Sequence, residues 1–180
     1  MAETSDVEAL VAACAAEVRL GDPFPEEYGY AHLSLCVLDA VFSIGVRYEG
    51  VRAVVARYAA WAQLDRVRPG DALPAPGDQQ PLGALVEHIE AFTESVVANR
   101  QRTSTRSGIL KADAVLRFAR VLVDHGVEVL QDVESRATDE ALDAALRAVP
   151  GQGGRHVRSP ALASRAYPLQ WAHGKSTFDC

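Results

Sequence analysis

Apolar residues recur along this chain every three or four positions, which is the spacing of one face of an α-helix. The first stripe begins where Ser5 and Glu8 form a Ser-x-x-Glu capping box. A later stretch, His32 to Ile44, is apolar on nearly all sides, which is typical of a helix buried at the centre of a domain. The pattern predicts helices over residues 5–18, 32–44, 51–62, 82–99, 110–125 and 138–149.

The segments between these stripes carry the signals of turns and helix ends. Residues 65–81 hold four prolines and three acids, so we predict a Pro-rich loop there. Gly126 is placed to end one helix, and Thr138 is placed to cap the next. No strand pattern and no internal repeat stands out. The sequence therefore predicts an all-α fold.

Composition and length are those of a globular protein with a sizeable core. The chain has 180 residues, of which 48% are hydrophobic and 23% charged. The opening MAETSDVEAL has no positive region and carries acids at once, unlike a secretory signal. No run approaches the ~20 apolar residues that span a bilayer. We expect a cytoplasmic protein without a membrane partner.

The cysteines do not suggest a disulfide framework or a metal site. Cys14, Cys36 and Cys180 are an odd set at wide spacing. The five histidines show no metal-ligand spacing either. We therefore predict no metal and no cofactor.

Charge is distributed in blocks although the net charge is −6. Residues 98–120 carry six bases against one acid, and residues 147–175 carry five bases and no acid. Residues 121–146 carry seven acids and one base. An acidic protein with basic blocks can present a local positive face, and solvated helix faces are the alternative. On the first interpretation, the candidate DNA-phosphate contacts in the first block are Arg102, Arg106 and Lys111.

A hairpin motif stands at the end of the last predicted helix. Residues 149–153 read Val-Pro-Gly-Gln-Gly. Glycines permit a close backbone approach, and a second helix starting there would point its free N–H groups at an anion. The alternative is an ordinary helix–helix turn. On the first interpretation, the DNA-phosphate contacts are Val149, Pro150, Gly151, Gln152, Gly153, Gly154 and Arg155.

A family resemblance is carried, in order and spacing, by three stretches of the sequence: Leu33 to Tyr58, Gly108 to Leu122 and Leu142 to Gly153. They cover about residues 30–155. The chain resembles the helix–hairpin–helix (HhH-GPD) superfamily of base-excision DNA glycosylases, the endonuclease-III-like enzymes, and looks closest to a bacterial branch with a Pro-Gly-Gln-Gly hairpin. The resemblance implies an all-helical, two-lobed fold, double-stranded DNA as partner and a part in DNA repair.

The resemblance also implies catalytic positions that this chain does not match. Arg155 stands where bifunctional members place the lyase amine, and a guanidinium stays protonated. His173 or Gly174 stands where members place a carboxylate, and the tail's acid is Asp179. Three cysteines cannot hold the iron–sulfur cluster of some members. We therefore predict a glycosylase-related DNA-binding protein with no assigned catalytic residue. The alternative is a non-enzymatic helical protein-interaction module, which the net acidity favours.

The tail differs in character from the rest of the chain. Apolar periodicity is weak after Gly154, and the composition is loosely basic. We predict a helical HhH-GPD-like domain over residues 1–153 and a divergent, weakly structured tail over 154–180. One hypothesis is that the glycosylase-like fold is incomplete at this end, through an altered reading frame or a truncation.

Asp39 is a further candidate because it lies in the most apolar predicted helix. Such an acid can be a cleft carboxylate with a raised pKa. It can equally cap a neighbouring helix or face a polar seam, and we favour this structural interpretation.

Overall fold

Six α-helices and one 3-10 turn make up the regular structure of the described residues. The computed structural model describes residues 29–43, 48–70, 72–92, 101–104 and 108–150. The prediction of an all-α protein is confirmed for these residues, and the predicted helix over residues 5–18 lies outside them. The elements are α2 (Leu33–Phe42), α3 (Tyr48–Trp61), η2 (Pro76–Asp78), α4 (Leu82–Phe92), α5 (Lys111–Asp124), α6 (Leu130–Ser135) and α7 (Glu140–Arg147).

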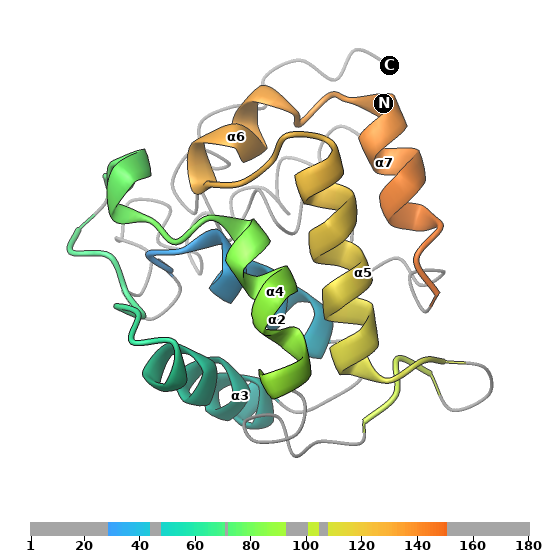
Figure 1. Cartoon of the computed structure of the whole chain (residues 1–180), viewed down its shortest axis with the longest axis horizontal. Coiled ribbons are helices and arrows are strands. Elements are labelled where there is room, and N and C mark those ends of the chain that lie inside the picture. The colour runs from blue at the N-terminus through green and yellow to red at the C-terminus, as the bar shows by residue number, and fades with distance from the viewer. Residues whose placement is uncertain (1–28, 44–47, 71, 93–100, 105–107, 151–180) are drawn as a thin grey trace, which may run out of the picture.

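Helix α2 lies at the centre of the fold, as its apolar sequence predicts. All of its residues from Leu33 to Phe42 are buried. It packs against α3, α4 and α5, which surround it in Figure 1. A helix enclosed on every side has no polar face to offer solvent, which explains why the 3.6-residue stripe is blurred in this part of the sequence.

Helices α5 and α7 are amphipathic and pack against each other. On α5, Val115, Phe118 and Leu122 point into the core, while on α7 the inward residues are Leu142 and Leu146. These inward positions recur every three or four residues, as the sequence predicts.

The structure agrees with the predicted end of α5 and corrects the predicted cap of α7. Gly126 follows α5 with φ +71°, a left-handed conformation that favours glycine at a helix end. The predicted cap Thr138 is wrong by one residue. Asp139 is the N-cap of α7, because its carboxylate accepts hydrogen bonds from the backbone N–H groups of Ala141 and Leu142 at 3.0 Å each.

The Pro-rich loop, residues 65–81, contains η2 and is joined to the rest of the fold by buried amide groups. The Gln79 side chain is 5% exposed and donates to the Pro74 carbonyl at 2.9 Å and to Gln131 Oε1 at 2.7 Å. Its Oε1 atom accepts from the backbone N–H of Leu130 at 3.0 Å. At the end of the loop, the backbone N–H of Gln80 donates to His32 Nδ1 at 3.0 Å.

Helix α6 is the described helix that the apolar pattern does not predict. It has six residues, of which Leu130 and Val133 are buried. Two apolar positions are too few to reveal a helical stripe. In the part of the chain that the structure describes, no helix is both long enough and apolar enough to cross a bilayer.

Candidate nucleic-acid interface

Residues 101–104 and 108–110 are the two described arms of a segment before α5, called loop 101–110 here, and hydrogen bonds join one arm to the other. Arg102 and Leu110 form an isolated antiparallel bridge. Inside this bridge, the backbone N–H of Thr103 donates to the Ile109 carbonyl at 2.9 Å. The two arms therefore run side by side like the base of a hairpin.

Gly108 lets the arms of this loop come close together. A Cβ atom at this position would lie 2.1 Å from the backbone nitrogen and 2.7 Å from the backbone oxygen of Ser104. It would also lie 2.8 Å from the Thr103 hydroxyl. Backbone atoms cannot yield as a flexible side chain can, so this geometry requires glycine.

The Arg102 side chain is exposed and is held partly by the same loop. Its Nε atom donates to the Gly108 carbonyl at 2.8 Å. A guanidinium has further N–H donors at its terminal nitrogens, in a planar fork that suits two oxygens of a phosphate. The sequence-predicted phosphate donor Arg102 is therefore at the surface and oriented by its own loop.

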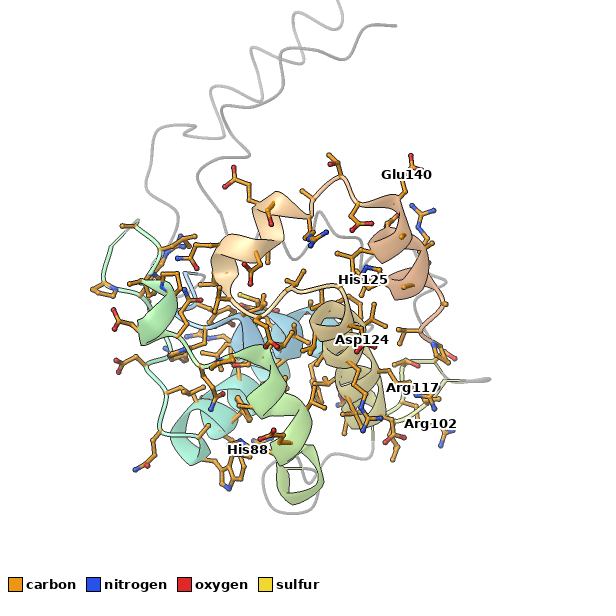
Figure 2. The ribbon with its side chains drawn as sticks, turned by 45° about the horizontal axis from the view of Figure 1, so that its top comes forward. His88, Arg102, Arg117, Asp124, His125 and Glu140 are labelled. Atoms are coloured by element: carbon orange, nitrogen blue, oxygen red, sulfur yellow. The ribbon has the colours of Figure 1, made fainter. Side chains whose placement is uncertain are left out.

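The exposed face of α5 adds a second arginine near this loop. Arg117 and Arg120 are exposed, and each lies four residues from an exposed aspartate, Asp113 and Asp124 respectively. Figure 2 shows Arg117 projecting on the same side as Arg102. The positive charges lie in the middle of this face, with a carboxylate at each end.

The end of α7 brings the start of the predicted hairpin to this side of α5. The backbone N–H of Val149 donates to the Leu146 carbonyl at 3.2 Å, and the Val149 side chain is 5% exposed, whereas Pro150 is exposed. In both figures the last residues of α7 and the described arms of loop 101–110 lie on the same side of α5. The remaining predicted contacts lie outside the described residues: Arg106, Gly151, Gln152, Gly153, Gly154 and Arg155.

Lys111 occupies a different environment from the one its basic neighbourhood predicts. Its side chain is 1% exposed, and its Nζ atom donates to the Phe42 carbonyl at 2.8 Å and lies 5.8 Å from the centre of the Phe42 ring. Burial lowers the pKa of this amine to about 8. A DNA-phosphate contact needs an ammonium group at the surface, so the prediction for Lys111 is corrected.

Asp39 is the centre of a buried hydroxyl cluster. Its carboxylate accepts hydrogen bonds from Tyr30 at 2.6 Å, from Ser43 at 2.9 Å and from Tyr48 at 3.2 Å. Burial, together with the neighbouring Asp39 carboxylate, raises the pKa of the Tyr30 phenol. The carboxylate is 0% exposed and joins α2 to α3 and to the chain before α2, as the structural interpretation of this residue predicts.

The described residues do not provide the ligand set of a metal site. Among the described residues, no group of three or more His, Cys, Asp or Glu side chains is arranged to hold a metal ion. Cys36 is buried in α2 and is not in a disulfide. The described donor at the candidate interface is the guanidinium group of exposed arginines, Arg102 and Arg117.

The described residues thus define an all-helical protein with a basic loop and a helix end on one side. The chain belongs to the family described as a domain of unknown function, DUF8548, whose model matches residues 8–159. The matched range includes loop 101–110 and the predicted hairpin. No curated protein and no solved structure matches the chain.

Proposed function

We propose that this chain binds double-stranded DNA through its phosphate backbone. The observation that carries the proposal is a shared location: Arg102, Arg117 and the end of α7 lie on one side of α5 (Figure 2). Arginine side chains and backbone N–H groups are donors that phosphate oxygens accept, and such contacts position a duplex without reading its bases. The predicted hairpin at 149–153 would add its N–H groups directly after α7.

The resemblance to the helix–hairpin–helix glycosylases supports the same partner. It places the Pro-Gly-Gln-Gly hairpin in the order and spacing of that superfamily. Arg155 stands at the position of the lyase amine, and a guanidinium cannot attack a sugar carbon as an amine does. We therefore propose a DNA-binding protein related to base-excision repair, without lyase chemistry at that position.

A salt series with a fluorescent duplex tests this function. Binding measured by anisotropy should weaken steeply as salt rises, because each phosphate contact releases condensed counterions. The logarithm of the association constant should fall linearly with the logarithm of the salt concentration, with a slope of about −0.9 for each contact. Absence of binding at the lowest salt concentration would contradict the proposal and favour the alternative, a helical protein-interaction module.

Three variants assign the binding to this side of the molecule. Arg117→Ala should reduce the salt slope by about one contact, since no hydrogen bond or ion pair of this side chain is described. Gly151→Val with Gly153→Val should weaken binding by obstructing the backbone approach. Arg57→Ala, at an exposed arginine on α3, is the control for a surface charge elsewhere and should leave the slope unchanged. Equal effects of Arg57→Ala and Arg117→Ala would show that the binding is not localised.

Catalysis is tested separately on a panel of duplexes with damaged bases. We expect binding without base release, because this chain does not match the catalytic positions of the helix–hairpin–helix glycosylases. Base release that is lost in Asp179→Asn would overturn this expectation and would assign the carboxylate role to the tail.

A further inference from the structure

Lys111 connects two parts of the fold through its backbone and its side chain. Its backbone N–H donates to the Gln101 carbonyl at 2.8 Å, which closes the base of loop 101–110. Its side chain runs in the other direction and donates to the Phe42 carbonyl at the end of α2. One residue therefore joins the base of the basic loop to the most deeply buried helix.

A lysine in this position is costly for the fold. Burying an ammonium group removes it from water, and the cost persists unless hydrogen bonds and nearby π electrons compensate for it. The Phe42 carbonyl and ring provide part of that compensation. An apolar side chain of similar length would fill the same volume without the desolvation cost. We therefore explain the ammonium group by the connection that it makes between the base of loop 101–110 and α2.

The hydrogen bonds described above for loop 101–110 connect the loop's own two arms. Those between Thr103 and Ile109 and between Arg102 and Gly108 set the shape of the loop. The Lys111 side chain connects the base of the loop to another part of the molecule, because its acceptor belongs to α2, 69 residues away in the chain.

We propose that Lys111 is a positioning residue that fixes the described arms of the loop, residues 101–104 and 108–110, and with them the Arg102 guanidinium, against the end of α2. The DNA-binding part of this inference rests on the proposed function. The positioning part does not, and it can be measured in the free protein.

Hydrogen–deuterium exchange on the full chain tests the positioning. Lys111→Met keeps the length of the side chain and removes its donor. Exchange in peptides covering 101–109 should accelerate about tenfold or more relative to wild type, while α4 and α6 keep their rates. Val115→Ala, one turn further along α5 and fully buried, is the matched control and should not act selectively on the loop. Unchanged loop exchange in Lys111→Met, or equal acceleration throughout the protein, would overturn the proposal.

Wild-type exchange provides a measurement that needs no variant to fold. If Lys111 anchors the loop, the amides of Thr103 and Lys111 should exchange as slowly as those within α5. Exchange of these two amides at the rate of open loops would contradict the proposal.

A double-mutant cycle in DNA binding tests whether Lys111 acts through Arg102. Affinities are measured for wild type, Lys111→Met, Arg102→Ala and the double variant. If Lys111 acts through Arg102, the double variant should bind like Arg102→Ala alone, with no additional loss. Independent, multiplicative losses would overturn the action through Arg102. If the wild-type protein does not bind DNA, the proposed function fails, and the exchange data still decide the positioning.

Discussion

The Pro-rich loop and loop 101–110 are both polar connections, but they are attached to the fold differently. In the Pro-rich loop, the buried amide of Gln79 bonds to Leu130 and Gln131, the first two residues of α6, and the backbone N–H of Gln80 donates to His32 before α2. In loop 101–110, the hydrogen bonds described join one arm to the other, and the Lys111 side chain connects its base to α2.

This difference separates a structural loop from a candidate binding loop. A loop whose polar groups are used inside the molecule has few of them left for a partner. A loop closed on itself can hold an arginine at the surface while its backbone stays satisfied, which suits recognition of phosphate. Polar composition alone does not distinguish the two cases.

Substitution of Gln79 should weaken the attachment of the Pro-rich loop to α6 and have the largest effect on stability. Gln79→Ala removes the side-chain acceptor of the backbone N–H of buried Leu130. The half-buried Pro74 carbonyl, in contrast, keeps a second donor, Gln131 Nε2, at 2.7 Å. We expect a loss of about 3 kcal/mol in the free energy of unfolding, measured by urea denaturation. Gln131→Ala, which keeps the bond from Gln79 to Leu130, should cost about 1 kcal/mol. Equal costs would show that Leu130 does not depend on Gln79.

The stability of the protein at alkaline pH should reveal the contribution of buried Lys111. The pKa of Lys111 is lowered from 10.5 to about 8, so between these values the unfolded chain binds more protons than the folded one. Stability should therefore rise from about pH 8 to about pH 10, by roughly 2 kcal/mol. Above about pH 10 it should fall, because burial raises the pKa of Tyr58 to about 12 and the folded phenol keeps its proton longer.

Comparison of wild type with Lys111→Met isolates this contribution. Urea midpoints measured at intervals from about pH 7 to pH 10 should rise in wild type and stay level in the variant. The same rise in both proteins would assign it to other groups and contradict the anchor's titration.

Acid should weaken the attachment of the Pro-rich loop at its other end, with the smallest effect. Burial lowers the pKa of His32 below 6.5, and its Nδ1 atom must be unprotonated to accept from the backbone N–H of Gln80. The stabilisation is therefore present above about pH 6.5 and lost as the pH falls, to an extent of about 1 kcal/mol.

Asn is the informative substitution at His32, because its side-chain oxygen can accept the same hydrogen bond without titrating. Thermal unfolding of His32→Asn should depend less on pH between about pH 7 and pH 5 than that of wild type. If His32→Asn loses as much stability in acid as wild type does, the titrating group lies elsewhere.

Periodicity was sufficient to predict the helices that carry the core. The apolar run of α2 and the stripe of α5 are local patterns, so they can be read without knowledge of the neighbours. The contact between Gln79 and Gln131 joins residues 52 positions apart, and no local rule places one beside the other. Sequence reasoning therefore missed the attachment of the Pro-rich loop.

The candidate site was predictable in part for the same reason. The exposed position of Arg102 follows from its basic, polar surroundings. Lys111 has equally basic neighbours along the chain, but the direction of its side chain is set by α5 and α2 together. The burial of a charge depends on tertiary packing and not on adjacent residues, so the predicted phosphate contact at Lys111 was wrong.

Gly108 also offers a way to recognise proteins that share this interface. The Cβ atom of any other residue would overlap the backbone of Ser104, so a chain with a side chain here cannot close the loop in this form. Relatives that keep glycine at this position, with the counterparts of Leu110 and Lys111 two and three residues later, are expected to keep the same loop. Relatives without it are expected to have a loop of another length or shape, and with it a different arrangement of charge on this side.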